Sequence, residues 1–316
     1  MPRDLDARRK PVPADLAGPL DRAVRGLFGV TWGKARSWIE AGKVRVSDEI
    51  ATELTARVPA GVVVTVDEQA PRLRGRTKPE EAHVVHVDAQ LIVVAKPSGV
   101  STVPYEGQEQ QQTDTLDARV RRWLERRPGA ASRGRRPELG VVHRLDKETS
   151  GLVVFARTWL AKQRLSSQFR KHTVERRYLA IAHGDVRSWT AHSFLLDNRG
   201  DGLRGSARGT PGPAAREAIT HVERVQGLAG ATLVSCRLET GRTHQIRIHL
   251  SEAGHPLVGE PVYVRGYPGP LLEAPRLMLH ATELGFVHPS TERLVRWELP
   301  LPEDMAQVLQ LLRASL

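Results

Sequence analysis

Apolar residues recur at helical spacing near the start of the chain. The pattern predicts two successive helices and then a short strand over residues 43–47, from Leu20, Val24 and Leu27 on one face, Trp38 and Ile39 in the second helix, and Gly42 at its end. Residues 1–16 are charged and rich in proline, a composition typical of a mobile tail. We therefore predict a mobile tail followed by a small α+β domain over residues 17–71.

Residues 72–82 are polar, charged and without periodicity, which is typical of a linker. A larger α+β domain is predicted over residues 83–316, opening with a buried strand that leads to Lys96 and a Pro-Ser-Gly turn. Further elements are helices over 115–127, 159–171 and 302–316, strands over 174–184, 216–225 and 230–250 with a turn at "TGR", and an extended connection over 195–214. In the second of these helices, Thr158 is the expected N-cap, with Ala161, Leu165 and Phe169 on the buried side.

The charge of the chain indicates a polyanionic partner. Lys and Arg number 47 against 36 Asp and Glu, a net charge of +11, and the isoelectric point is near 10.3. Nucleic acid is favoured over a membrane surface. In the small domain, the residues expected to contact phosphates are Lys34, Arg36 and Lys43, accompanied by Arg22, Arg25 and Arg45. An ordinary solvated helix pair would show the same pattern. Charge alone does not distinguish an RNA partner from a DNA partner. The sequence lacks a recognition-helix pattern with a dimer signal, which argues against a DNA-binding protein.

Several classes of site find no support in the sequence. The chain has one cysteine, Cys236, so it has no disulfide framework or cysteine-rich metal site, and we expect a reducing, cytoplasmic environment. His244 and His249 are five residues apart, which is not the spacing of a zinc-protease helix. Neither a phosphate-binding glycine loop nor a nucleophile elbow is present, and no apolar run is long enough for a membrane span. We expect neither a metal nor a cofactor.

One carboxylate stands among cations. In "HRLDKETSGL", Asp146 lies between Arg144 and Lys147, and "TGRTHQIRIHL" supplies Arg242 and Arg247 on what is predicted to be a second strand. A guanidinium beside a carboxylate favours its ionised form, which suits a nucleophile better than a general acid. A structural salt bridge would fit the same residues.

These residues belong to a longer series of motifs. "AKPSGV", "HRLDKETSGL", "VERRYLAIAHG", "LETGRTHQIRIHLSEAGHPLVGEPVY" and "LMLHATELGFVHP" follow in this order, and together they resemble the large-subunit-type pseudouridine synthases over roughly residues 83–300. Residues 19–66 resemble the small RNA-binding domain of ribosomal protein S4. The resemblance implies a mixed, mostly antiparallel sheet with a central cleft, and isomerisation of uridine in RNA to pseudouridine without cofactor or metal.

The resemblance also implies roles for single residues. Asp146 matches the catalytic aspartate, Tyr178 the tyrosine that lies against the target base, and Arg247 the arginine that pairs with the aspartate. Arg144 matches the arginine that enters the RNA helix where the uridine leaves it. Lys96, Arg176 and Arg242 are further expected RNA contacts. Whether Asp146 attacks the sugar or the base, or deprotonates the ribose, stays open.

The chain departs from the family pattern in two of these motifs. Arg176 replaces the usual Lys, and "GEPVYV" replaces the usual "GDPLYG", which introduces Glu260 and Val264. Because none of these is Asp146, Tyr178 or Arg247, we expect an active enzyme. We also expect it to be a monomer. Large-subunit ribosomal RNA is the expected substrate, with transfer RNA as the alternative. A catalytically silent RNA-binding or ribosome-assembly protein is a second alternative, against which the intact set of three residues argues.

Overall fold

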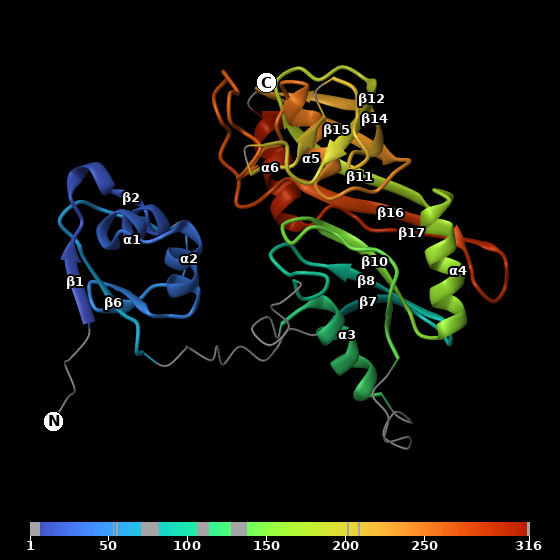
Figure 1. The fold of residues 1–316 in the computed structure, drawn as a ribbon, viewed down its shortest axis with the longest axis horizontal. Helices are drawn as coiled ribbons and strands as arrows, with labels where there is room; N and C mark the ends of the chain where they lie inside the picture. Colours follow the sequence, from blue (N-terminus) through green and yellow to red (C-terminus); the bar gives the residue numbers. More distant parts are fainter. Residues whose placement is uncertain are drawn as a thin grey trace. The chain divides into compact units, whose positions relative to one another are not determined.

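The chain forms two compact units, residues 1–78 and 79–316 (Figure 1). A computed structural model describes residues 7–52, 54, 56–70, 82–105, 114–127, 138–200, 202–207 and 209–314. The linker predicted over residues 72–82 lies outside these ranges except for Ala82. In the described part of the chain, no helix combines the length and the apolar character that crossing a membrane requires.

The smaller unit packs two helices against short strands. Its four-stranded sheet has the order β1 (Ala7–Pro11), β6 (Val63–Asp67), β3 (Val44–Val46) and β4 (Glu49–Ile50), and β2 (Gly18–Pro19) pairs with β5 (Arg57–Val58). A short 3-10 helix, η1 (Ala14–Leu16), precedes α1 (Leu20–Phe28) and α2 (Trp32–Glu40). The two predicted helices and the predicted strand are confirmed. Leu20, Val24 and Ile39 are fully buried in the core of this unit.

The mobile tail predicted over residues 1–16 is wrong for its described part. Ala7–Pro11 form β1, which pairs antiparallel with β6 from Ala7 opposite Asp67 to Pro11 opposite Val63. The charged side chains of this segment are exposed at a sheet edge while its backbone is hydrogen-bonded. Composition therefore described the side chains correctly, but the pairing depends on a strand more than fifty residues away in the sequence.

The larger unit is built on a mixed, mostly antiparallel sheet, as the resemblance implies, and the described residues contribute eleven strands to it. Its path is β13-β12-β14-β15-β11-β16-β10-β8-β7, with β17 on β16 and β9 on β10. The strands are β7 (His83–Val87), β8 (Leu91–Lys96), β9 (Gly140–Val141), β10 (Ser150–Ala156), β11 (Glu175–His183), β12 (Trp189–Leu196), β13 (Gly205–Ser206), β14 (Arg216–Leu228), β15 (Ala231–Leu238), β16 (Leu279–Val287) and β17 (Leu294–Glu298). Of its pairs, β10 with β16 is parallel and the others are antiparallel.

Four helices cover this sheet (Figure 1): α3 (Leu116–Glu125), α4 (Trp159–Arg170), α5 (Gln245–Glu252) and α6 (Glu303–Ala314). The helices predicted at α3, α4 and α6 are confirmed, and the Thr158 side chain caps α4 by accepting a hydrogen bond from the Ala161 N–H at 3.1 Å. The strand predicted through residue 250 is wrong beyond Leu238, because residues 245–252 form α5. All residues from Gln245 to Leu250 are buried, polar ones included, so the first turns of the helix have no solvent-exposed face that a pattern could reveal.

Strand β10 begins within the "LDKETSGL" stretch, at Ser150, and is buried along its whole length. Gly151 sits at φ +124, and a Cβ atom there would lie 2.3 Å from the backbone oxygen of Ala281. Only glycine permits this close approach of the parallel neighbour β16. The turn before β10 is thereby fixed against the middle of the sheet.

Candidate active site

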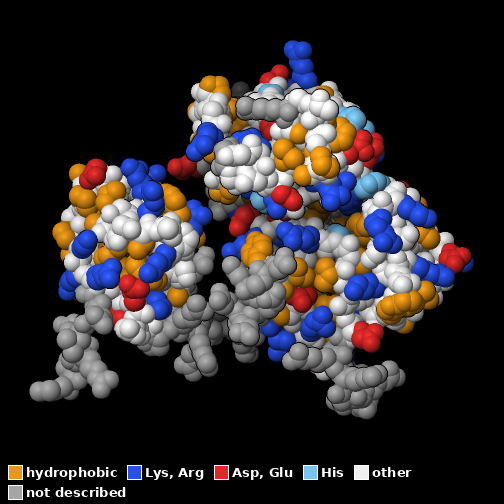
Figure 2. Space-filling model, in the orientation of Figure 1, with side chains coloured by type: hydrophobic (Ala, Val, Ile, Leu, Met, Phe, Trp, Pro, Cys, Tyr) orange, Lys and Arg blue, Asp and Glu red, His pale blue; other side chains and the backbone are white. Residues whose placement is uncertain are grey.

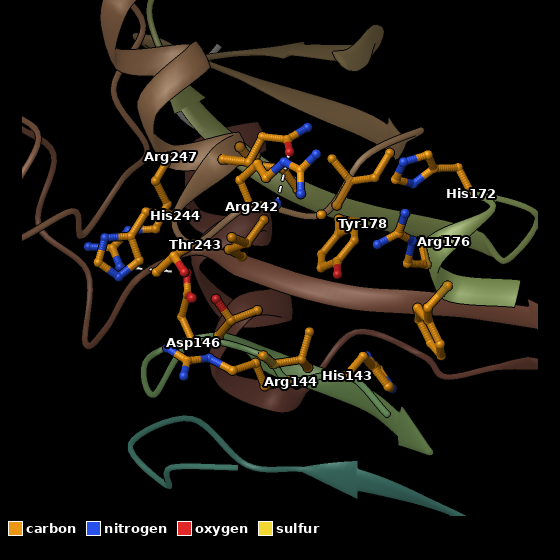
Figure 3. Close-up of a pocket in the computed structure, with 18 of the residues that line it drawn as sticks. His143, Arg144, Asp146, His172, Arg176, Tyr178, Arg242, Thr243, His244 and Arg247 are labelled. Atoms are coloured by element: carbon orange, nitrogen blue, oxygen red, sulfur yellow. Dashed lines mark hydrogen bonds and ion pairs between the residues drawn. The ribbon is translucent and has the colours of Figure 1, made fainter. Parts of the chain in front are cut away.

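A cleft of ≈ 600 Å³ opens in the larger unit, and several segments of the chain line it (Figure 3). Arg144 and Asp146 come from the loop before β10, Arg176 and Tyr178 from β11, and Arg242 to Arg247 from the loop before α5 and its first turn. Helix α4 adds Ser166, Phe169 and Arg170. The expected central cleft is thus present, and it brings together residues that are more than a hundred positions apart.

The loop that carries Asp146 is fastened by the turn after β8. The Thr102 hydroxyl donates to the Leu145 carbonyl at 2.9 Å and accepts from the Leu145 N–H at 3.1 Å. The Gly99 N–H donates to the Lys147 carbonyl at 2.9 Å, and the Ser98 hydroxyl donates to the Glu148 carbonyl at 2.7 Å. These bonds hold the residues on either side of Asp146, so the carboxylate projects into the cleft from a rigid loop.

Lys96 is part of this hydrogen-bond network between the two loops, which contradicts the RNA contact predicted for it. Its side chain is 2% exposed, and its Nζ donates to the carbonyls of Pro97, Val100 and Lys147 at 3.0, 2.7 and 2.9 Å. Burial lowers the pKa of Lys96 to about 7, an effect opposed by Glu148 and Asp146. An ammonium enclosed by three carbonyl oxygens has no donor left for a phosphate. Its position joins the two loops instead.

Arg247 stands between two carboxylates. Glu260 accepts from its Nε at 2.7 Å and from its Nη2 at 2.6 Å, and the Asp146 Oδ2 lies 3.7 Å from its Nη1. The side chains of Arg247 and Glu260 are 4% and 0% exposed. Burial by itself lowers the pKa of Arg247, but the hydrogen bonds and charge of Glu260 outweigh it and raise the pKa above the ordinary value. Arg247 is therefore a permanent cation held beside Asp146.

Tyr178 brings an aromatic ring to the cleft. It is 8% exposed and lies on β11, where the register with β16 shifts between Arg177 and Tyr178. Burial raises the pKa of Tyr178 to about 12, so its hydroxyl stays protonated near neutral pH. In Figure 3 the ring lies between Arg176 and the segment that carries Arg242, above Asp146. It offers stacking area together with a hydroxyl donor.

Three more arginines line the same cleft. The Arg176 Nη2 donates to the Glu239 carbonyl at 2.9 Å, while its Nε is buried without a hydrogen-bond partner. Gly241 makes room for this side chain, because a Cβ there would lie 2.5 Å from the Arg176 Nη1. The Arg242 Nε donates to the Glu217 carbonyl at 2.9 Å. Arg144 is exposed at the cleft. The cleft wall is therefore cationic around a single carboxylate, which favours a substrate that carries phosphates.

The comparison with protein families decides the class of this site. Residues 90–252 match the family model described as RNA pseudouridylate synthase. The chain belongs to the RNA pseudouridylate synthase family. The enzyme is 35% identical to "Ribosomal large subunit pseudouridine synthase D" of Nitrosomonas europaea over 96% of this chain and 87% of that protein. It is 33% identical to the protein of the same name from Pseudomonas aeruginosa, over 98% of this chain and 97% of the other.

A solved structure shares the fold. "Human RNA Pseudouridylate Synthase Domain Containing 4" superposes with a TM-score of 0.58 at 23% identity, covering 73% of this chain and 93% of that one. The expected fold, a mixed and mostly antiparallel sheet with a central cleft, preceded in the sequence by a small α+β unit, is confirmed. The predicted enzyme class, an RNA pseudouridine synthase, is also confirmed.

Two residues of the site, Glu260 and His244, were not assigned a role from the sequence. Glu260 was noted only as a departure from the family motif, and the signal that could have found it is an acidic residue at the family-motif position in "GEPVY". His244 adopts φ 60 at the start of α5, and its Nδ1 forms a hydrogen bond of 2.8 Å with the Tyr263 hydroxyl. Among the described residues, no three His, Cys, Asp or Glu side chains gather in a way that would hold a metal ion.

The three basic residues predicted in the smaller unit have mixed surroundings. Lys34 and Arg36 are exposed; the Lys34 Nζ lies 3.5 Å from a Glu68 carboxylate oxygen, and the Arg36 Nε lies 3.1 Å from one of Asp21. Lys43 is half-buried and donates to the Glu68 carbonyl at 2.5 Å. Lys34 and Arg36 are thus accessible to a phosphate, while Lys43 fastens the sheet.

Proposed function

We propose that this enzyme converts specific uridines of large-subunit ribosomal RNA to pseudouridine, with Asp146 as the nucleophile or base. The observation that carries the proposal is the meeting of Asp146, Tyr178 and Arg247 in one cationic cleft. The substrate is inferred from the names of the relatives, which include several ribosomal large subunit pseudouridine synthases.

The residues fit the requirements of the reaction. The bond between uracil N1 and the ribose breaks, the base rotates, and uracil C5 bonds to the same ribose carbon, so the product is an isomer and no co-reactant is consumed. The target base must first leave its stack. Tyr178 provides the surface against which it rests, Arg247 orients the carboxylate, and Asp146 attacks the sugar or the base, or removes a ribose proton.

The remaining basic residues hold the RNA. In this proposal Arg144, Arg176 and Arg242 contact the RNA around the target uridine. The smaller unit acts as an S4-like anchor through Lys34 and Arg36, and its contacts with phosphates weaken as the salt concentration rises. Figure 2 shows Lys and Arg side chains distributed over the visible faces of both units. The enzyme works as a monomer in the cytoplasm, where its single buried cysteine stays reduced.

A map of pseudouridine in the RNA of the source organism tests the proposal. An allele with Asp146→Asn is expected to lose defined sites in large-subunit ribosomal RNA while the purified variant still binds RNA. Asp185→Asn, an exposed carboxylate outside the cleft, is the matched control and is expected to change no site. Loss of transfer RNA sites alone would assign the other substrate. Retention of every site by a folded Asp146→Asn variant in a strain without a second synthase would refute the catalytic role.

A further inference from the structure

Basic side chains lie over aromatic rings at several places in the smaller unit. Four cations lie over rings within this unit: Lys10 over Phe28, Arg25 and Arg36 over Trp32, and Lys34 over Trp38. Figure 2 shows hydrophobic side chains interleaved with Lys and Arg on the visible face of this unit. Such interleaving is typical of surfaces that bind single-stranded nucleic acid, where phosphates need cations and unstacked bases need rings.

Trp32 is the exposed ring of this set. It is 42% exposed, whereas Trp38 is 5% exposed and packs in the core of the unit. In the described part of the unit, the other large apolar side chain with comparable exposure is Ile50, at 43%. The indole carries the guanidinium carbon of Arg25 at 4.9 Å and that of Arg36 at 5.6 Å from its centre. An exposed tryptophan lowers the solubility of a protein. A ligand that stacks on the ring, with cations beside it, explains why such a side chain stays at the surface.

The backbone around Trp32 favours an anion at the same place. Trp32 is the first residue of α2, and Thr31 before it accepts a hydrogen bond from the Lys34 N–H at 3.3 Å. A helix start carries partial positive charge and unpaired N–H groups. Space next to it is open, because a Cβ added at Gly33 would meet no atom within 4 Å.

We propose that Trp32, with Arg25 and Arg36, forms a stacking site for an unpaired base of the RNA and its adjacent phosphate. The inference rests on the proposed function of this unit as an RNA anchor, and it specifies the form of RNA that the anchor selects. A base inside a duplex has both faces covered by its neighbours, so it offers nothing for Trp32 to stack on. The smaller unit therefore favours loops and single strands over continuous helices.

Binding of the full-length protein to two probes tests this site: a single-stranded oligouridine of about 12 nucleotides and an RNA duplex of the same length. Trp32→Ala is expected to weaken oligouridine binding roughly 5-fold to 150-fold and to leave duplex binding unchanged. Trp32→Phe keeps a ring and is expected to restore most of the affinity. Ile50→Ala removes an equally exposed apolar side chain from the same unit and is the matched control, expected to bind like the wild type.

Three results would overturn the stacking site: wild-type affinity of Trp32→Ala for oligouridine, equal losses on both probes, or tighter Trp32-dependent binding of an acidic polyglutamate peptide than of oligouridine. Circular dichroism confirms that each variant is folded. Oligouridine binding does not depend on isomerisation, so a defect of Trp32→Ala stands even if the Asp146→Asn map shows no lost site. Conversely, lost sites in that map together with an indifferent Trp32→Ala would remove the stacking site and leave the proposed function intact.

Discussion

The buried pair of Arg247 and Glu260 allows stability and catalysis to be separated by mutation. Both side chains are almost fully enclosed, and two hydrogen bonds of 2.7 and 2.6 Å join them. A buried ion left without its partner is strongly unfavourable, whereas two apolar side chains of similar size tolerate burial. Arg247→Met and Glu260→Leu are therefore expected to be costly alone and much less costly together.

The magnitude follows from these contacts. Each single substitution removes one partner of a buried pair and is expected to lower the free energy of unfolding by about 3–5 kcal/mol. Glu260→Leu also leaves the N–H groups of Val262 and Tyr263 without the carboxylate that accepts from them at 2.9 and 3.3 Å. These amides remain unpaired in the double variant, whose expected loss is about 2 kcal/mol. The coupling energy of the cycle is then about 4 kcal/mol or more.

Activity is expected to behave differently from stability. The double variant regains most of the stability, but it lacks the cation that lies 3.7 Å from the Asp146 carboxylate. Misplacement of a reacting group by about 1 Å can cost about 100-fold in rate, so single-turnover pseudouridine formation is expected to fall at least about 100-fold. Chemical denaturation followed by circular dichroism gives the stabilities of all four proteins, and a single-turnover assay with fixed RNA gives the rates.

A second bidentate pair provides the control. Arg276 contacts Asp304 at 2.5 and 2.8 Å outside the cleft, and the Asp304 side chain is 40% exposed. Arg276→Met with Asp304→Leu is expected to leave the rate unchanged. The reasoning fails if the Arg247 and Glu260 losses simply add in the double variant, because the pair would then not be an isolated buried unit. A wild-type rate in the double variant would show that Arg247 has only a structural role.

Three further predictions concern the cleft and its supports. Tyr178→Phe keeps the ring but removes a hydroxyl whose pKa is raised to about 12, so RNA binding is expected to persist while single-turnover conversion slows. Lys96→Met removes the Lys96 hydrogen bonds to the carbonyls of Pro97 and Val100 and one of the two hydrogen bonds to the Lys147 carbonyl, and it is expected to lower the free energy of unfolding by about 3 kcal/mol in chemical denaturation. Burial lowers the pKa of His249 and of His280 from 6.5 to about 4, so each contributes stability that is complete above pH 6.5 and lost as the pH falls towards 4, by up to about 3 kcal/mol.

Each of these predictions has its own check. Tyr267→Phe, outside the cleft, is expected to convert RNA at the wild-type rate, and an unchanged rate in Tyr178→Phe would remove that hydroxyl from the mechanism. Lys171→Met alters an exposed lysine and is expected to leave the free energy of unfolding unchanged. A Lys96→Met variant as stable as the wild type would contradict the role of Lys96 in holding the two loops together. Denaturation between pH 6.5 and pH 4 is expected to show a shallower loss in His280→Gln, and parallel curves would rule out its contribution.

Much of the local structure followed from the sequence because it depends on near neighbours. The helices α1, α3 and α4 each have one buried face and one solvated face, so their apolar residues recur with the period of the helix. Thr158 was identified as a cap because the capping bond spans three residues. The resemblance to pseudouridine synthases also rested on local motifs, and it brought Asp146, Tyr178 and Arg247 together before the structure did.

Helix α5 shows where a pattern fails. Ile246, Ile248 and Leu250 alternate with Arg247 and His249 as they would on a strand, yet all of these residues are buried in a helix. Enclosure on every side removes the contrast between apolar and polar faces from which periodicity is read. The tertiary surroundings of α5 therefore decided its conformation.

Charge was the other property that the sequence determined only in part. It supplied the basic composition and the carboxylate of Asp146, but not which cations face RNA and which are internal. Lys96 meets a carbonyl 51 positions away, and Glu260 meets Arg247 from 13 positions further along the chain, beyond the end of α5. Whether a lysine contacts phosphate or is buried and hydrogen-bonded to loop carbonyls depends on the surfaces that exclude water from it. Those surfaces exist only once the chain has folded.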